Sequence, residues 1–315
     1  DISARTTLGR CLRTQGKLEE ARQIYEDVIA LEPDDSSHAL RLVRLDLTEG
    51  RFGEAVRELD RLEQLEEEGL KDSIGRIRGR LAYRMGQPKY RLKLAREGLA
   101  AKEAKTLPLF RLIRKAGLVD ALLDAGEEVD AKVIVDEMSA LKGDNVEMMA
   151  AEVQGDWATY QEDADGLEAA LDQTKEIASR MPFGGMLTSL NTVERARVDR
   201  FRGECKSALE KLDALLEDKP SKIRDWSYVE ERMLCLLDLQ RFTEAVELGR
   251  RFAAYDPGDA DIYELLARAY DGAKKPREAR KTYERLLELW ANAEDDYKRM
   301  LDARAALLEL SARSE

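Results

Sequence analysis

The chain repeats a short pattern of small and large apolar residues spaced four and three positions apart. In the first copy this face consists of Ala21, Tyr25 and Val28. Residues with that spacing share one side of a helix, so the pattern predicts a helix. Pro33 ends it because proline cannot continue the hydrogen-bond ladder, and Gly16 separates it from an earlier helical pattern. The first 35 residues therefore predict a helix-turn-helix unit.

The same face recurs along the chain, in most copies just after a glycine. The later copies are Ala55, Leu59 and Leu62; Ala131, Val135 and Met138; Ala208, Leu212 and Leu215; Ala245, Gly249 and Phe252; and Ala279, Tyr283 and Leu286. The first two copies start 34 residues apart, and so do the last two, which is the period of a helical-hairpin repeat. A small residue lets two antiparallel helices approach, and glycine permits a tight turn. Such units become stable by stacking on one another.

This pattern resembles that of the tetratricopeptide repeat family. The residues that carry the resemblance are Leu8, Gly9, Leu12, Ala21, Tyr25, Val28 and Pro33, and again Tyr263, Leu266, Ala267, Tyr270, Ala279, Tyr283 and Leu286. The resemblance covers nearly the whole chain and implies an all-α, right-handed superhelical solenoid of about eight repeats plus a C-terminal capping helix. The predicted repeats are 2–35, 36–70, 72–107, 112–143, 144–182, 189–222, 226–259 and 260–292.

The predicted domains follow from these repeats. They are an N-terminal block at 1–143, an irregular repeat and glycine-containing connector at 144–188, a C-terminal block at 189–292 and a capping helix at 293–315. In the third repeat Arg91 occupies the small-residue position, so looser or shifted packing is expected. Two registers remain open for 144–182, with the turn at either Gly155 or Gly166. The segment 181–186 is the candidate for a bend between blocks, and an ordinary long turn is the alternative.

Composition supports a helical chain and narrows its class. The chain has 43% hydrophobic, 37% charged and 6% aromatic residues with seven prolines, a balance typical of helices rather than strands. No apolar stretch approaches the roughly 18 to 20 residues of a membrane span, and the first residues do not form a secretory leader. Cys11, Cys205 and Cys235 form no CxxC pair, so they are expected to be reduced, buried thiols of a cytoplasmic protein. Because Asp1 replaces an initiator Met, a longer parent chain is one interpretation.

The sequence offers little for catalysis. It has a single histidine, His38, and no paired cysteines, so neither a metal site nor a cofactor is expected. A nucleophile elbow, a phosphate-binding glycine loop and a dinucleotide fingerprint are all missing. The carboxylate run Glu66-Glu67-Glu68 is typical of a solvated helix face. We therefore expect a non-enzymatic protein.

The resemblance implies that the first helix of each repeat lines a concave groove. It also implies that the residue after the Gly9-type position points into that groove. The residues expected there are Arg10, Arg44 and Arg80, with Arg13, Arg76, Tyr83 and Arg84 one turn away on the same face. Arg197, Arg200 and Arg268 fall at comparable positions in later repeats.

Charge is distributed unevenly along the chain. Residues 1–110 carry 21 basic and 20 acidic side chains, whereas 111–315 carry 31 and 44, and residues 73–96 have eight basic residues without an acidic one. Arginine binds carboxylates and phosphates through two hydrogen bonds at once. An acidic or phosphorylated segment is therefore the expected ligand, with Leu40, Leu47 and Tyr83 supplying apolar contacts. The alternative is that the arginines pair with neighbouring Asp and Glu side chains.

The leading functional prediction is a scaffold that binds a protein or peptide of acidic character. The alternative is a regulatory, sensing or self-association module of a larger bacterial signalling protein, either a kinase or a transcription regulator. It rests on the similarity of residues 279–310, especially 283–290, to the ends of repeat regions in such proteins. The resemblance also covers clamps for chaperone C-termini, but arginine replaces their groove asparagine here, which disfavours that ligand. A net charge of −12 disfavours nucleic acid.

Overall fold

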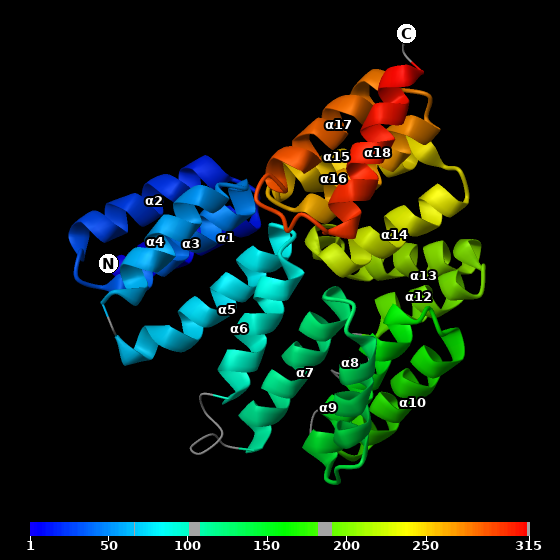
Figure 1. The fold of residues 1–315 in the computed structure, drawn as a ribbon, viewed down its shortest axis with the longest axis horizontal. Coiled ribbons are helices and arrows are strands. Elements are labelled where there is room, and N and C mark those ends of the chain that lie inside the picture. Colours follow the sequence, from blue (N-terminus) through cyan, green and yellow to red (C-terminus); the bar gives the residue numbers. More distant parts are fainter. Residues whose placement is uncertain (66, 101–107, 182–190, 314–315) are drawn as a thin grey trace. The chain divides into compact units, whose positions relative to one another are not determined.

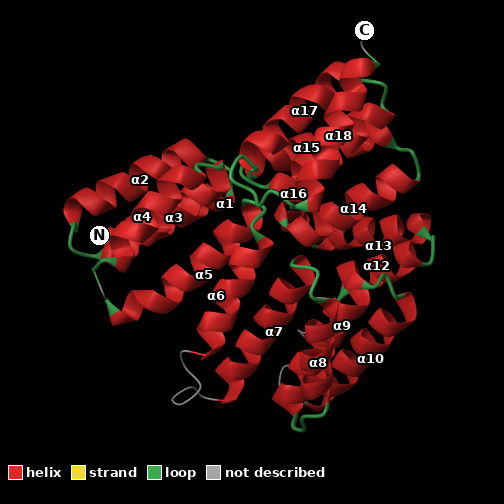
Figure 2. Ribbon diagram, in the orientation of Figure 1, coloured by secondary structure: helices red, strands yellow, loops and turns green. Residues whose placement is uncertain are grey.

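The computed structural model describes residues 1–65, 67–100, 108–181 and 191–313, and every regular element within them is a helix (Figures 1 and 2). The helices are α1 (Ile2–Thr14), α2 (Leu18–Leu31), α3 (Ser36–Glu49), α4 (Phe52–Glu63), α5 (Glu68–Arg84), α6 (Pro88–Ala100), α7 (Pro108–Asp124), α8 (Glu128–Ser139), α9 (Asp144–Tyr160), α10 (Ala164–Arg180), α12 (Thr192–Phe201), α13 (Cys205–Asp218), a 3₁₀ turn (Pro220–Arg224), α14 (Trp226–Asp238), α15 (Phe242–Tyr255), α16 (Ala260–Gly272), α17 (Pro276–Leu289) and α18 (Lys298–Ala312). The all-α prediction, built from helix-turn-helix pairs, is confirmed.

The turn inside each of the eight helix pairs contains one residue in the left-handed backbone region. These residues are Gly16, Gly50, Gly86, Gly126, Glu162, Gly203, Gln240 and Lys274. The left-handed region costs an ordinary residue steric energy that glycine avoids, which is why five of the eight are glycine. This residue gives every pair the same local reference point.

The small-residue position lies five residues after this reference point. Its alanines are fully buried in six pairs, at Ala21, Ala55, Ala131, Ala208, Ala245 and Ala279. The third pair has Arg91 there, which forms an ion pair with Asp124 of the next pair. The fifth pair has Leu167, which is also buried. The prediction of small residues at the helix crossings is therefore confirmed in the pairs that follow the pattern.

Both registers considered for 144–182 are wrong. The turn is at residues 161–163, so Gly155 lies inside α9 and Gly166 inside the first turn of α10. Asp163 caps α10, since its carboxylate accepts a hydrogen bond from the backbone N–H of Gly166. A side-chain cap and a left-handed Glu162 replace the glycine signal that the other turns carry.

The described chain divides into two compact units, called unit 1 (residues 1–87 and 246–315) and unit 2 (residues 88–245). The boundary at 87/88 falls between α5 and α6, inside the third predicted repeat with its atypical Arg91. The predicted domain bounds differ from these units and stay a prediction. The predicted bend at 181–186 lies outside the described residues except for Met181.

Unit 1 draws its core from both ends of the chain. Leu59 and Leu62 of α4 belong to the same buried cluster as Leu286 of α17 and Trp290. The final helix α18 starts at Lys298, five residues later than the predicted cap at 293, and buries Met300, Ala303 and Leu310. Unit 2 has its own core around Leu122, Met138 and Val153. Among the described helices, none combines the length and apolar character needed to cross a membrane.

Candidate binding site

The three arginines predicted to line the groove occupy one structural position in successive helix pairs. Counting six residues back from the left-handed residue gives Arg10 on α1, Arg44 on α3 and Arg80 on α5. All three side chains are exposed. The position therefore repeats through the N-terminal part of unit 1, and the ligand of these arginines stays a prediction.

Arginines crowd together in this part of unit 1. Burial is the largest cause that lowers the pKa of Arg44, and the charges of three neighbours lower it further: Arg41, Arg76 and Arg13. Burial, followed by the charge of Arg84, also lowers the pKa of Arg80. The lowered pKa values thus reflect partial desolvation of the two guanidinium groups first and repulsion from neighbouring positive charges second. The site is therefore electrostatically suited to an anion.

We define the arginine cluster as Arg10, Arg13, Arg41, Arg44, Arg76 and Arg80. Within residues 1–65, 67–100, 108–181 and 191–313, no carboxylate forms an ion pair with any of them. Arg76 donates a hydrogen bond to the hydroxyl of Ser73, which is neutral. The alternative prediction, that these arginines pair with acidic neighbours, therefore does not describe the cluster.

Arg41 belongs to this cluster although it is not among the predicted groove residues. It lies one turn before Arg44 on α3, and its buried Nε has no hydrogen-bond partner among the described residues. Tyr25 of α2 is buried beneath the cluster, where burial raises its pKa and Arg13, Arg41 and Arg10 partly oppose that rise. The spacing of Arg41 and Arg44, which equals that of Arg10 and Arg13, was the available sequence signal.

The two other predicted groove residues, Tyr83 and Arg84, have partners inside unit 1. Arg84 donates two hydrogen bonds to the carboxylate of Asp256, at 2.9 and 2.7 Å, and one to the backbone oxygen of Leu47 at 2.8 Å. The hydroxyl of Tyr83 donates to Asp261 at 2.9 Å. Both carboxylates come from the C-terminal part of the chain, so this end of the predicted site is occupied intramolecularly.

The apolar contacts expected from Leu40 and Leu47 are not available to a ligand. Both side chains are buried in the core of unit 1, with about 5% of their surface exposed. They face the neighbouring helices because their positions on α3 belong to its packed side. Tyr83 keeps 39% of its surface exposed.

The same structural position has a different environment in unit 2. In the sixth pair it holds Arg197, which binds the fully buried Glu231 at 3.1 Å together with Arg200 at 2.7 Å. In the fourth and fifth pairs it holds Asp120 and Asp156. Burial, then the charges of Asp120 and Glu152, raise the pKa of Asp156 to about 7. At this position the first three pairs hold arginines that form no ion pair among the described residues, and the eighth pair, in unit 1, holds a further one, Arg268.

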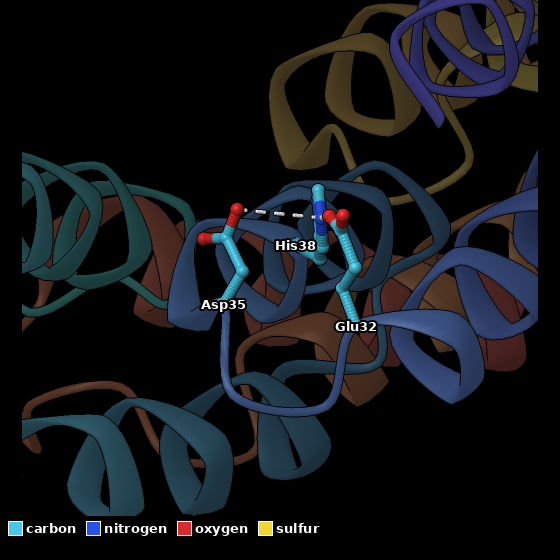
Figure 3. A group of neighbouring side chains, drawn as sticks. All are labelled: Glu32, Asp35 and His38. Atoms are coloured by element: carbon cyan, nitrogen blue, oxygen red, sulfur yellow. Dashed lines mark hydrogen bonds and ion pairs between the residues drawn. The ribbon is translucent and has the colours of Figure 1, made fainter. Parts of the chain in front are cut away.

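A second group of polar side chains joins α2 to α3 (Figure 3). The Nε2 of His38 lies 2.9 Å from Glu32 and 3.4 Å from Asp35, and His38 is buried. One nitrogen of His38 and one carboxylate oxygen each of Glu32 and Asp35 lie within 4.8 Å of one another, and a divalent cation can bind ligand atoms of these types. The other ring nitrogen, Nδ1, is buried without a hydrogen-bond partner among the described residues, whereas histidines that bind metals usually donate from it. The group is accounted for as a hydrogen-bonded turn.

The cysteines follow the prediction only in part. Cys205 and Cys235 are buried, and burial is the largest cause that raises the pKa of each thiol. Cys11 was expected to be buried too, but it is exposed because it lies on the solvent side of α1.

The helix pairs, the shared turn geometry and the buried small residues define an all-α protein of stacked helical hairpins. The tetratricopeptide repeat family model matches residues 4–68 and 236–309. Together with the repeated helix pairs, these two matches support the assignment of the chain to the tetratricopeptide repeat family. Such repeats are in general non-catalytic scaffolds for protein interaction.

Solved structures share this fold at low sequence identity. A tetratricopeptide repeat protein from Parabacteroides merdae superimposes with a TM-score of 0.52 at 12% identity, over 98% of both chains. A chain of the APC/C hetero-tetramer Cut9-Hcn1 gives a TM-score of 0.62 at 11% identity, over all of this chain and 64% of that one. No curated protein matches the sequence.

Proposed function

We propose that the protein is a non-enzymatic scaffold whose arginine cluster binds an acidic or phosphorylated segment of a protein partner. The observation that carries this proposal is the crowding of guanidinium groups without carboxylate partners on α1, α3 and α5. Crowded positive charge is destabilising on its own, and an anion relieves it.

Arginine determines the chemistry of the ligand. A guanidinium group is a planar fork that binds a carboxylate or phosphate through two parallel hydrogen bonds. Because the cluster repeats over three helix pairs, a segment with several negative charges fits it better than a single ion does. Binding of acidic or phosphorylated peptides by arginine clusters is a known mode of recognition, and the affinity of such a complex falls as the salt concentration rises.

The test is fluorescence anisotropy with a fluorescein-labelled hexaglutamate peptide, and with a second peptide that contains phosphoserine. The variant replaces Arg10, Arg44 and Arg80 by alanine. We expect it to weaken binding at least about tenfold, since each lost charge-assisted hydrogen bond contributes about 1.5 to 3 kcal/mol and tenfold corresponds to about 1.4 kcal/mol.

A matched control replaces Arg5, Arg277 and Arg304 by alanine. These three arginines are exposed and lie outside the cluster, so the control makes the same change in net charge. Circular dichroism should show both variants to be helical. Equal binding by the two triple variants would contradict the proposed function.

A further inference from the structure

A short acidic segment of the C-terminal part docks on the N-terminal helix pairs within unit 1. We call residues 256–261, Asp-Pro-Gly-Asp-Ala-Asp, the acidic turn; it consists of the link between α15 and α16 and the first two residues of α16. The backbone N–H of Gly258 donates a hydrogen bond of 2.7 Å to the backbone oxygen of Thr48, at the end of α3. This bond joins backbone to backbone, so it fixes the place of the turn directly.

The docking requires a residue without a side chain at position 258. A Cβ added to Gly258 would lie 2.2 Å from the backbone oxygen of Leu47 and 2.5 Å from the backbone nitrogen of Gly50. Both atoms belong to the backbone, so neither can move aside as a flexible side chain would. A Cβ added to Gly50 would in turn lie 3.2 Å from the Cα of Gly258 and 2.8 Å from Cδ2 of Leu289. The two glycines therefore permit a contact that other residues would prevent.

The carboxylates of the acidic turn bind residues that belong to the predicted site. Asp256 and Asp259 lie 2.7 and 3.6 Å from the guanidinium group of Arg84, and Asp261 accepts the hydrogen bond of Tyr83. Asp256 also contributes to the electrostatic environment of Arg80. The turn thus places three carboxyl groups within six residues beside Arg84, and Asp256 is near enough to influence Arg80.

The turn has the chemistry of the ligand that the cluster suits. It is short and acidic, it presents a carboxylate to arginine in a bidentate manner, and it is held by side chains next to the cluster. We infer that the acidic turn is an internal competitor: docked, it occupies Arg84 and Tyr83, and an acidic partner that extends from the cluster must displace it. This inference rests on the proposed function.

The experiment combines binding with a local readout of docking on the full chain. Hydrogen exchange with mass spectrometry measures the protection of peptides that contain residues 256–262, with and without the hexaglutamate peptide. The main variant is Gly258→Ala, which leaves every arginine in place. The matched control is Gly117→Ala, because a Cβ there meets no atom within 4 Å among the described residues.

We expect three results. Hexaglutamate raises exchange in the acidic turn of the wild type. Gly258→Ala raises it without the peptide, and the same variant binds hexaglutamate about five- to tenfold more tightly, because the apparent dissociation constant falls as the open fraction grows. The control binds as the wild type does.

The outcomes separate the two proposals. If the wild type binds the peptide but exchange in the turn does not change, and Gly258→Ala binds equally, internal competition is overturned and the arginine cluster stands. If Gly258→Ala leaves exchange in the turn unchanged, the docking contact does not hold the turn and the inference fails. If neither protein binds the peptide, the proposed function fails and this inference fails with it.

A second variant covers the case in which Gly258→Ala does not fold. Asp256→Asn keeps the shape of the turn and removes the charge that Arg84 binds. Its control is Asp302→Asn, an equal charge change at an exposed position of α18. Tighter peptide binding by Asp256→Asn than by Asp302→Asn supports internal competition, and equal binding overturns it.

Discussion

At the scale of the single residue, two glycines that both lie inside helices differ in the space available for a side chain. Gly9 lies in α1 directly under the ring of Tyr25, and a Cβ there would be 2.6 Å from Tyr25 Cε1. Tyr25 is 3% exposed, so its ring has no room to retreat. Gly98 of α6 has open space within the described residues. Both glycines lie in helices, so the packing around each one determines whether a larger residue fits there.

We predict that Gly9→Ala destabilises the protein although alanine is the better helix former. Overpacking a buried site costs about 1 to 3 kcal/mol, which exceeds the helix-propensity gain of about 0.5 to 1 kcal/mol. Gly98→Ala should show that gain alone. Thermal unfolding followed by circular dichroism compares the two variants, and an equal rise in Tm for both would disprove the assigned contact.

At the scale of the element, the turn residue sets the register of each helix pair. Lys274 occupies the left-handed position that glycine occupies in five other turns, at a φ of 60°. A non-glycine residue pays roughly 1 to 2 kcal/mol there. The turn between α16 and α17 is therefore formed at a local cost.

We predict that Lys274→Gly stabilises the protein by about 1 kcal/mol, since the backbone strain disappears while glycine also loses more entropy on folding. The reverse change, Gly126→Ala, should destabilise by a similar amount. Gly126 has a φ of 74° and no atom within 4 Å of its added Cβ in the described part of the chain, so only backbone strain contributes. Urea unfolding of both variants gives the comparison, and shifts of the same sign would refute it.

The sequence predicted the helix pairs because their information is local. Ala21 and Ala55 mark helix crossings, and a glycine five positions earlier marks the turn. The fifth pair was placed wrongly because Glu162 and Leu167 occupy those two positions. The contact of Arg84 with Asp256 was beyond prediction, since the two residues are 172 positions apart and no repeat pattern links them. Packing between distant repeats leaves no period in the sequence.

At the scale of the whole molecule, the buried Asp259 of the acidic turn makes the stability of the folded state depend on pH. Asp259 is buried, and burial raises its pKa; the charges of Asp261 and Asp256 raise it further, against Arg84. In the unfolded chain an aspartate has a pKa of about 3.9. The folded state therefore holds a proton more readily than the unfolded state does.

We predict that Asp259 destabilises the folded protein increasingly as pH rises. A raised pKa in the folded state means that stability falls between the unfolded value and the raised folded value, because the unfolded state binds fewer protons there. Asp259→Asn removes this titration and keeps a good helix N-cap. The Tm of the variant relative to wild type should rise from pH 5 to pH 8. A difference that stays constant over this range would contradict the assignment.

The separation of Arg84 from Asp256 has a consequence for synthesis on the ribosome. The arginines of the first three pairs are made first, and Asp256 follows 172 residues later. At about 5 to 20 residues per second, that interval lasts roughly 10 to 30 seconds. During this interval Arg84 has no Asp256 to bind. Leu62 also cannot pack against Leu286 and Trp290 until those residues of the shared core have been synthesised. Of the two units, unit 1 thus begins to be translated before unit 2 and is completed after it.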